Sequence, residues 1–232
     1  MKKICTICAR SGSKGLKNKN IRELLGKPLI AHTILQAQST DIFDAISVSS
    51  DSKDILDVAA NYGIDNLIER PYELATDQAS KLLTIRHCLK ATEEITKRRF
   101  DVIVDLDVTS PLRSADDIKN AVNLLDKQKV SNVITGVPAR RSPYFNMVEL
   151  DQNGIARLPK PPKDQFFRRQ DSPQCYDMNA SIYVWKRKCL LDSDSIWNEQ
   201  TRLYVMSEAS MDIDSGLDFE IVEFLMSRGK KI

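Results

Sequence analysis

A basic, glycine-containing segment follows the first apolar stretch of the sequence. Residues 10–22 carry five Lys or Arg side chains and no acidic one. Gly12 and Gly15 let the backbone approach an anion closely and turn its N–H groups toward it. The segment matches neither the Walker A motif nor GxGxxG, which disfavours both standard nucleotide folds. It therefore predicts a site for a phosphate-like anion, and the alternative is a solvated basic loop.

Two carboxylates, Asp212 and Asp214, lie two residues apart near the end of the sequence. On an extended segment such residues face the same side, so both can contact one cation. A small set of hard oxygen ligands, completed by water and phosphate, suits Mg²⁺. Nucleotidyl transfer needs both a phosphate loop and such a pair, so the two signals support each other. Two alternatives remain: acidic caps of a helix N-terminus, and a rival metal site at Asp105 and Asp107.

Polar side chains also follow two other strand-like runs. Arg70 begins the segment RPYELATD after residues 66–68, and Asp107 begins DVTSPLR after residues 101–106. Ligands of open parallel sheets bind at the carboxyl ends of the strands, so these loops are expected beside the basic segment. Two structural alternatives are a surface position for Arg113 at a helix start and a capping role for Asp107.

The composition excludes several classes of protein. With 42% hydrophobic and 28% charged residues, the chain is neither disordered nor collagen-like. Its 34 Lys and Arg against 32 Asp and Glu give a net charge of +2, too balanced for a general nucleic-acid or membrane coat. No apolar run approaches the ~18–20 residues of a membrane span. We therefore expect neither a nucleic acid nor a membrane as partner.

The five cysteines are scattered and odd in number, which favours a reducing, cytoplasmic location over a disulfide framework. Cys5 and Cys8 form a CxxC within an apolar strand-like run. Their offset on a strand points the two thiols to opposite faces. Both are expected to be buried core thiols rather than a metal or redox pair, and His32 and His87 are expected to be structural.

Strand-like and helix-like runs alternate over much of the sequence, which predicts an α/β protein with a mostly parallel sheet and helices on both faces. Helices are expected to open at Pro28 and at the capping residues Ser52, Ser80 and Ser114. The helix after Ser80 is expected to carry an apolar face of Leu83, Ile85, Cys88, Leu89 and Ile95. Predicted strands cover 3–9, 45–49, 66–68, 101–106, 132–137, 180–185 and 203–206, and a closing amphipathic helix covers 217–226.

The alternation breaks between Pro138 and Gln174. This stretch holds six prolines and two pairs of adjacent arginines. Its composition predicts an inserted arm, at about 138–175, rather than a separate folding unit. We therefore expect one domain over residues 1–232.

Together these segments resemble the acylneuraminate cytidylyltransferases, also called CMP-sialic acid synthetases. The resemblance covers nearly the whole chain and rests on ARSGSKGLKNKN, RPYELATD, TSPLR, MNASIY and MSEASMDIDSGLDF. It implies a Rossmann-like nucleotidyltransferase fold and a reaction that joins CTP to a nine-carbon 2-keto sugar acid with release of pyrophosphate. It also implies dependence on Mg²⁺ (or Mn²⁺) and a homodimer in which the arm reaches across to the partner.

The resemblance assigns roles by position. Arg10, Lys19 and Asp214 match catalytic residues, and Asp212 and Asp214 match the metal-binding pair. The implied nucleotide-binding residues are Arg10, Ser11, Gly12, Lys14, Gly15, Asn20 and Arg70. The implied sugar-binding residues are Asp107, Thr109, Ser110, Arg169, Asn179 and Tyr183. No residue stands out as the general base.

Two positions depart from the sialic-acid enzymes. Asp107 stands where they usually carry Gln, and Phe145 aligns with a Lys of the arm. An Asp only accepts hydrogen bonds, whereas Gln donates and accepts, so we expect a different pattern of sugar substituents. The DLDVTSPLR segment resembles the branch that acts on legionaminic acid, a 5,7-diamino relative of sialic acid. Legionaminic acid is therefore favoured over N-acetylneuraminic acid, and the alternatives are a CMP-Kdo-type synthetase and a non-catalytic nucleotide-binding protein.

Overall fold

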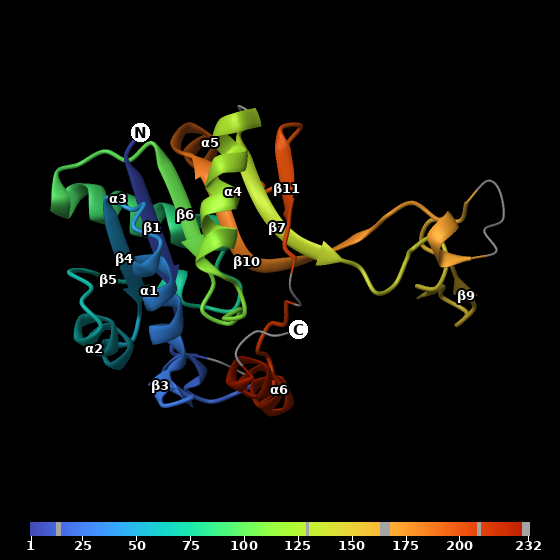
Figure 1. Cartoon of the computed structure of the whole chain (residues 1–232), viewed down its shortest axis with the longest axis horizontal. Helices are drawn as coiled ribbons and strands as arrows, with labels where there is room; N and C mark the ends of the chain where they lie inside the picture. The colour runs from blue at the N-terminus through green and yellow to red at the C-terminus, as the bar shows by residue number, and fades with distance from the viewer. Residues whose placement is uncertain (13–14, 129, 163–167, 208–209, 229–232) are drawn as a thin grey trace.

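A seven-stranded sheet forms the centre of the computed structural model, which describes residues 1–12, 15–128, 130–162, 168–207 and 210–228. In the described part of the chain the strand order is β11-β7-β10-β6-β1-β4-β5 (Figure 1). The strands are β1 (Lys3–Cys8), β4 (Ala45–Ser50), β5 (Asn66–Glu69), β6 (Val102–Leu106), β7 (Asn132–Pro138), β10 (Tyr176–Lys186) and β11 (Thr201–Val205).

The predicted mostly parallel sheet is confirmed. β1 pairs in parallel with β4 and β6, β4 with β5, and β11 with β7. β10 runs antiparallel to both β6 and β7, so the sheet is mixed at this position. β10 is also longer than the predicted 180–185, and its register shifts between Met178 and Tyr183.

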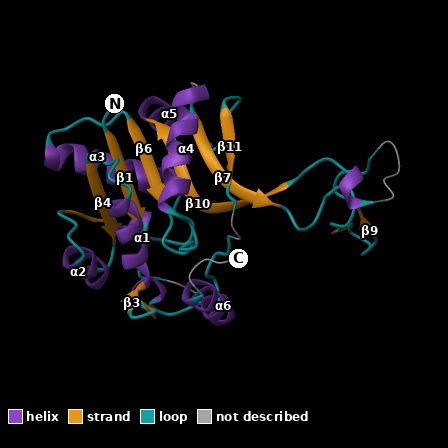
Figure 2. Cartoon of the chain, in the orientation of Figure 1, coloured by secondary structure: helices purple, strands orange, loops and turns teal. Residues whose placement is uncertain are grey.

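Helices cover both faces of the sheet, as predicted (Figure 2). Side chains of β6 alternate between two cores: Val104 packs with Ile30 and Ile118 on one face, and Ile103 packs with Ile85 and Trp185 on the other. This alternation follows from the two-residue period of a strand, and both faces are apolar because helices bury both. The helices are α1 (Leu29–Ser39), α2 (Lys53–Asn61), α3 (Lys81–Thr96), α4 (Ala115–Gln128), α5 (Arg187–Asp192) and α6 (Gly216–Ser227).

Shorter elements connect these. They are the 3-10 turns η1 (Lys19–Ile21), η2 (Tyr72–Leu74) and η3 (Arg169–Asp171) and the two-residue strands β2 (Glu23–Leu24), β3 (Lys27–Pro28), β8 (Glu149–Leu150) and β9 (Ala156–Arg157). No helix among the described residues has the length and apolarity that a membrane crossing requires.

The apolar face predicted for α3 was partly wrong. Leu83 and Ile95 are 48% and 61% exposed, whereas Leu82 is buried. The buried side of the helix follows Leu82, Ile85 and Leu89, which recur at helical spacing. The helix begins after Ser80 as predicted, but the Ser80 side chain makes no capping hydrogen bond, and neither does that of Ser52 before α2.

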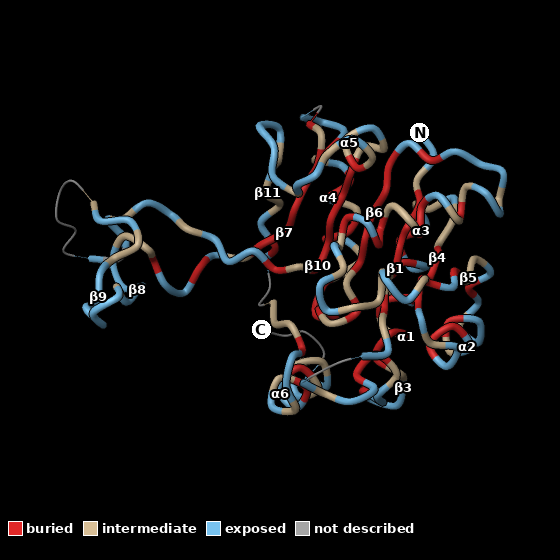
Figure 3. Tube along the Cα trace, turned by 180° about the vertical axis from the view of Figure 1, so that it is seen from behind, coloured by how far each residue is buried: buried red, intermediate tan, exposed pale blue. Residues whose placement is uncertain are grey.

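The predicted arm leaves the sheet between β7 and β10 and projects away from the body of the protein (Figure 1). Its ends lie together, because Pro138 at the end of β7 pairs with Tyr176 at the start of β10. Figure 3 shows that most of its described backbone is exposed. Its exposed apolar side chains are Phe145, Met147, Val148, Leu150 and Ile155.

Candidate functional site

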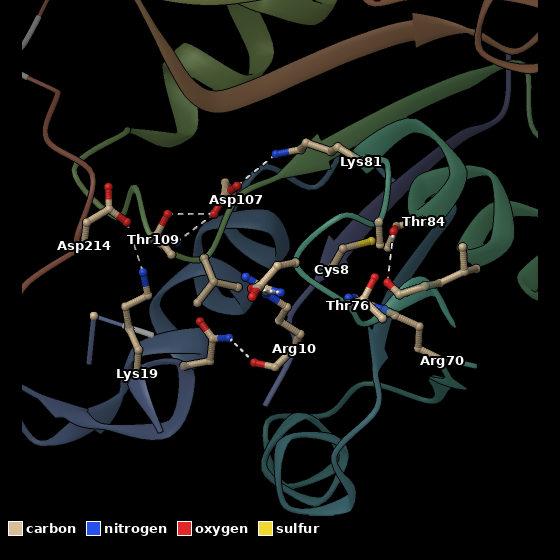
Figure 4. A pocket seen from close by; sticks show the side chains of 16 residues that line it. Cys8, Arg10, Lys19, Arg70, Thr76, Lys81, Thr84, Asp107, Thr109 and Asp214 are labelled. Carbon is tan, nitrogen blue, oxygen red and sulfur yellow. Dashed lines mark hydrogen bonds and ion pairs between the residues drawn. The ribbon is translucent and has the colours of Figure 1, made fainter. Parts of the chain in front are cut away.

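A pocket of about 490 Å³ lies where β1, β5 and β6 end (Figure 4). The residues that follow these strands form its walls, as the strand-end rule predicts. The polar and charged residues among those lining it are Arg10, Lys19, Asn20, Arg70, Thr76, Asp77, Lys81, Thr84, Asp107, Thr109 and Asp214. The basic segment, the two strand-end loops and one member of the acidic pair therefore share one cavity.

The basic segment passes directly against the acidic pair. A Cβ added to Gly15 would lie 2.0 Å from the backbone oxygen of Asp214, so any other residue would force these two segments apart. Gly12 has open space around it and lines an adjoining hollow of about 440 Å³ with Ser11. Lys14, predicted to bind the nucleotide, lies outside the described residues.

Carboxylates contact both cations predicted to hold phosphate. Arg10 Nη1 lies 2.7 Å from Asp77 Oδ1. Lys19 Nζ donates to the carbonyl of Ile213 and lies 3.3 Å from Asp214 Oδ1. A bound anion would therefore compete with these carboxylates for the two cations.

Ser11 is tied to a third carboxylate. Its N–H and Oγ donate to Asp51 at 2.9 and 2.6 Å. Burial raises the pKa of Asp51, but the hydrogen bonds from Ser11 outweigh it and leave the pKa below its ordinary value. Asp51 thus holds the start of the basic segment next to the end of β4.

Asn20 and Arg70, both predicted to contact the nucleotide, are more than nine-tenths buried and line the pocket. Asn20 Nδ2 donates to the carbonyl of Arg10 at 2.9 Å, while its Oδ1 is buried and has no partner in the part of the chain that the structure describes. Arg70 Nη2 donates to the carbonyl of Ser49 at 2.6 Å. An unpaired buried oxygen is costly, so Asn20 Oδ1 is a ready acceptor for a ligand donor.

The acidic pair is fixed by the residue between its members. Ile213 is fully buried, and its N–H donates to the carbonyl of Thr109 at 2.8 Å. The proposed capping alternative was wrong, because Ser215 and Asp218 form the capping box of α6. Asp212 and Asp214 are therefore available for another purpose.

The acidic pair has features that fit a divalent cation. Asp212 Oδ1 is buried without a partner among the described residues, and the Asp214 side chain is 82% exposed. Burial raises the pKa of Asp212, and the nearby charges of Asp107 and Asp214 raise it further despite a hydrogen bond from Ser110. A cation would relieve this concentration of negative charge. The described residues contain no cluster of three or more candidate ligands, so phosphate and water would have to complete the coordination.

The rival acidic pair already faces a cation of the protein. Lys81 Nζ lies 2.8 Å from Asp107 Oδ2 and 3.4 Å from Asp105 Oδ2. Burial raises the pKa of Asp107, but the charge and hydrogen bonds of Lys81, with hydrogen bonds from Thr109, lower it overall. Burial keeps the pKa of Asp105 raised, although Lys81 opposes it. The Lys81 ammonium lies where a metal ion would bind, which disfavours this pair as the metal site.

A second cavity, of about 840 Å³, adjoins Asp212 and contains the predicted sugar residue Asn179. Asn179 Oδ1 accepts from Thr135 Oγ1 at 2.6 Å, within the irregular part of β10. The apolar residues lining this cavity include Met178, Met206, Met211, Ile221 and Leu225. Asp212 lines this cavity, whereas Asp214 lines the pocket of about 490 Å³.

Two predicted sugar residues, Ser110 and Tyr183, do not line these two cavities, and a third lies on the arm. Ser110 is 1% exposed, and its Oγ lies 3.5 Å from that of Ser210. Tyr183 is 5% exposed and packs its ring against Lys81. The backbone of Arg169 lies in η3 on the arm. Ser110 and Tyr183 were selected by motif, although both face inward. The projecting arm carries the backbone of Arg169 away from the pocket of its own chain.

Lys81 is not part of any motif that the sequence offers, and for Arg113 a surface position at a helix start was an alternative. The structure excludes this alternative, because Arg113 is 1% exposed. Its Nη1 donates to the carbonyls of Asp107 and Ser110 at 2.7 and 2.9 Å, and its Nη2 donates to Thr33 Oγ1 at 2.8 Å. Burial lowers the pKa of Arg113 to about 10. The buried Arg113 therefore holds the loop after β6 in place through hydrogen bonds to the backbone of that loop.

The cysteines differ in their burial. All five cysteines are free, and Cys5 is fully buried, as predicted. Cys8 was expected in the core but lies at the end of β1, half-buried in the pocket wall. Cys8 is partly exposed because β1 ends at the pocket. The two-residue period of the strand does not decide its exposure.

Comparisons with known proteins find a matching family model, relatives of nearly the same length and a similar fold. Residues 4–219 match the family model described as Cytidylyltransferase. The chain is 48% identical over 225 residues to a CMP-N,N'-diacetyllegionaminic acid synthase of Campylobacter jejuni, covering 97% of this chain and 94% of the relative. It is 46% identical over 224 residues to the post-translational flagellin modification protein B of Campylobacter coli, covering 96% and 94%. A solved CMP:2-keto-3-deoxy-manno-octonic acid synthetase complexed with CTP matches with a TM-score of 0.71 at 18% identity, covering 98% of this chain and 99% of that one.

Proposed function

Because the chain belongs to the cytidylyltransferase family, we propose that it transfers the cytidylyl group of CTP to a sialic-acid-like sugar acid, giving a CMP-sugar and pyrophosphate. One observation carries the proposal: the basic segment and Asp214 meet in the same pocket at the end of the sheet. A pocket with converging cations and an exposed carboxylate suits a triphosphate better than a neutral ligand.

In this reaction the anomeric hydroxyl of the sugar attacks the α-phosphorus of CTP. The new oxygen–phosphorus bond forms as the bond to pyrophosphate breaks, and the hydroxyl proton leaves to solvent or a nearby base. Arg10 and Lys19 exchange their carboxylate partners for phosphate oxygens and neutralise the charge that builds on pyrophosphate. Asn20 Oδ1 and Arg70 face the cytidine portion of the nucleotide.

Asp212 and Asp214 would hold Mg²⁺ (or Mn²⁺), and a metal ion bound there would add positive charge beside the phosphates. The unpaired Asp212 oxygen supports this role. Chelation with EDTA should abolish turnover, and added Mg²⁺ should restore it. Full activity in EDTA would show that the cations of the protein suffice.

Legionaminic acid is the acceptor that we favour over N-acetylneuraminic acid. A relative at 48% identity is named for the N,N'-diacetyl form of this sugar. The cavity of about 840 Å³ next to Asp212 offers apolar side chains to acetyl groups. Asp107 offers an acceptor-only group to the pocket, at a position where the resemblance to the sialic-acid enzymes implies Gln.

We expect a homodimer in which the arm contacts the partner. The exposed apolar side chains of the arm support this, because a free loop would expose them to water. A cytoplasmic location follows from the use of CTP, an intracellular metabolite, and fits five free thiols.

The test is pyrophosphate release from CTP with a panel of acids: N,N'-diacetyllegionaminate, N-acetylneuraminate and the eight-carbon acid Kdo. We expect release only when a nine-carbon acid is present, and fastest with legionaminate. Equal release without any sugar, or a preference for ATP over CTP, would contradict the proposal. Tight CTP binding without turnover on any acid would favour the non-catalytic alternative.

A further inference from the structure

Lys81 is the first residue of α3 and extends toward the end of β6 (Figure 4). Its ammonium group has three neighbours: Asp107 Oδ2 at 2.8 Å, Asp105 Oδ2 at 3.4 Å and the ring of Tyr183, whose centroid lies 4.5 Å away. An ammonium group has three N–H donors, and a cation over an aromatic face is itself stabilised. The ammonium group of Lys81 therefore faces two carboxylates and an aromatic ring, while its side chain is 34% exposed and lines the pocket.

Asp107 has one place left for a ligand. Its Oδ1 accepts from the N–H of Thr109 at 3.0 Å and from Thr109 Oγ1 at 2.9 Å, while its Oδ2 accepts from Lys81. A carboxylate has about four lone-pair positions, so one remains, on Oδ2. The Asp107 side chain is 25% exposed and lines the pocket, whereas the side chain of Asp105 is 1% exposed. A bound molecule can thus reach Asp107 but not Asp105.

We propose that Lys81 is a positioning residue that fixes Asp107 as a single hydrogen-bond acceptor, so that the pair selects sugar acids presenting an N–H or O–H donor at that point. This inference rests on the proposed function and assigns the selection to a pair rather than to Asp107 alone. A fixed site of this kind rejects an analogue without the donor, because its buried oxygen is then left unpaired.

The surrounding charges leave Lys81 little scope for binding phosphate directly. The charged or titratable groups near the pair are Asp105 on β6, Tyr183 on β10, Asp212 before α6 and the buried Arg113. Lys81 faces two carboxylates at once. Among the described residues, Arg10 and Lys19 each form an ion pair with one carboxylate, which is exposed and which a triphosphate can displace. Release of Lys81 would leave Asp105 buried beside Asp107 with no cation between them, which is costly.

A double-mutant cycle tests the pairing. Lys81→Met, Asp107→Asn and the double variant are assayed for the KM of CTP and of both nine-carbon acids. We expect Lys81→Met to raise the KM of legionaminate about 10-fold and to leave the KM of CTP within about 2-fold. In the Asp107→Asn background the same substitution should change the legionaminate KM less than about 2-fold. Additive effects, or a raised KM for CTP alone, would overturn the inference.

Controls separate positioning from folding. Lys90→Met removes a lysine from the exposed side of the same helix and should leave every constant unchanged. If Lys81→Met does not fold, Thr109→Val replaces it: this variant loses one hydrogen bond to Asp107 Oδ1, keeps every charge, and should also raise only the sugar KM. An unchanged sugar KM in Thr109→Val would contradict a selection that depends on the fixed geometry of Asp107.

Calorimetric binding distinguishes failure of this inference from failure of the proposed function. Binding of legionaminate that weakens in Lys81→Met, with no turnover in the wild-type protein, would contradict the proposed function only. Turnover by the wild-type protein, together with equally tight sugar binding by the wild-type protein and Lys81→Met, would contradict the inference only.

Discussion

The Asp214 carboxylate is exposed and touches only one partner among the contacts described, so removing its charge should affect chemistry more than folding. We expect Asp214→Asn and Asp212→Asn each to lower kcat at least ~10²-fold, because a preorganised metal site contributes several kcal/mol to such transfers. Steady-state pyrophosphate release measures this, with circular dichroism as the folding check.

The control for the acidic pair is Asp57→Asn on the exposed side of α2, which should leave kcat unchanged. Near-wild-type kcat in either Asp212→Asn or Asp214→Asn would show that this pair does not hold an essential metal.

Asp107→Gln converts the acceptor-only group into the residue usual in sialic-acid enzymes. Because Gln also donates a hydrogen bond, we expect kcat/KM to fall for legionaminate and to rise relative to it for N-acetylneuraminate, with the KM of CTP nearly constant. Competition between the two sugars in one reaction measures the ratio directly. An equal loss of kcat/KM for both sugars would mean that Asp107 only caps the turn at Thr109 and does not distinguish the sugars.

At the scale of elements, one ion pair joins α3 to the start of α5. Arg187 donates to both carboxylate oxygens of Glu93 at 3.0 and 2.8 Å, and Glu93 also accepts from the N–H of Phe100. Burial raises the pKa of Glu93, but these hydrogen bonds outweigh it, so the pKa lies below its ordinary value. A lowered pKa in the folded state stabilises the protein above the pKa of the unfolded state, and this stability is lost as the pH falls.

Glu93→Gln should therefore lower the melting temperature by about 3 °C at pH 7. The difference from wild type should shrink as the pH falls below about 4, where the wild-type carboxylate also becomes protonated. Thermal unfolding at several pH values measures this. A difference that is constant across this range would mean that Glu93 contributes through packing alone.

The elements were predictable where local patterns decide them. The apolar runs gave the parallel strands, and the strand-end rule brought Arg10, Arg70 and Asp107 to one pocket. Local patterns could not show that Arg113 is buried, because its partners Ser181 and Thr33 lie 68 and 80 residues away in the chain. They also could not show that Lys81 faces carboxylates such as Asp107, which lies 26 residues away on another element. Likewise, no spacing rule distinguishes the outward Asp107 from the inward Ser110.

At the scale of the whole molecule, we expect the arm to form the contact surface of the homodimer. Replacing residues 140–174 by Asn-Gly would join Ala139 to Cys175, which already share a backbone hydrogen bond of 2.9 Å. Light scattering of this variant should show monomers, since its apolar contact surface is gone.

Leu150→Glu, at a residue 71% exposed on the arm, should weaken the dimer without shortening the chain. An unchanged dimer in both variants would refute the role of the arm.

The paired ends of the arm bear on how such enzymes diversify. Pro138 and Tyr176 are direct partners in adjacent antiparallel strands. The sheet therefore fixes the two ends of the arm, whatever the length of chain between them. Insertions, deletions or whole exchanges between relatives can therefore accumulate there without altering the register of the seven strands or the pocket at their ends. The catalytic body and the projecting arm can evolve at separate rates, so chimaeras that graft the arm of one relative onto the body of another should still fold.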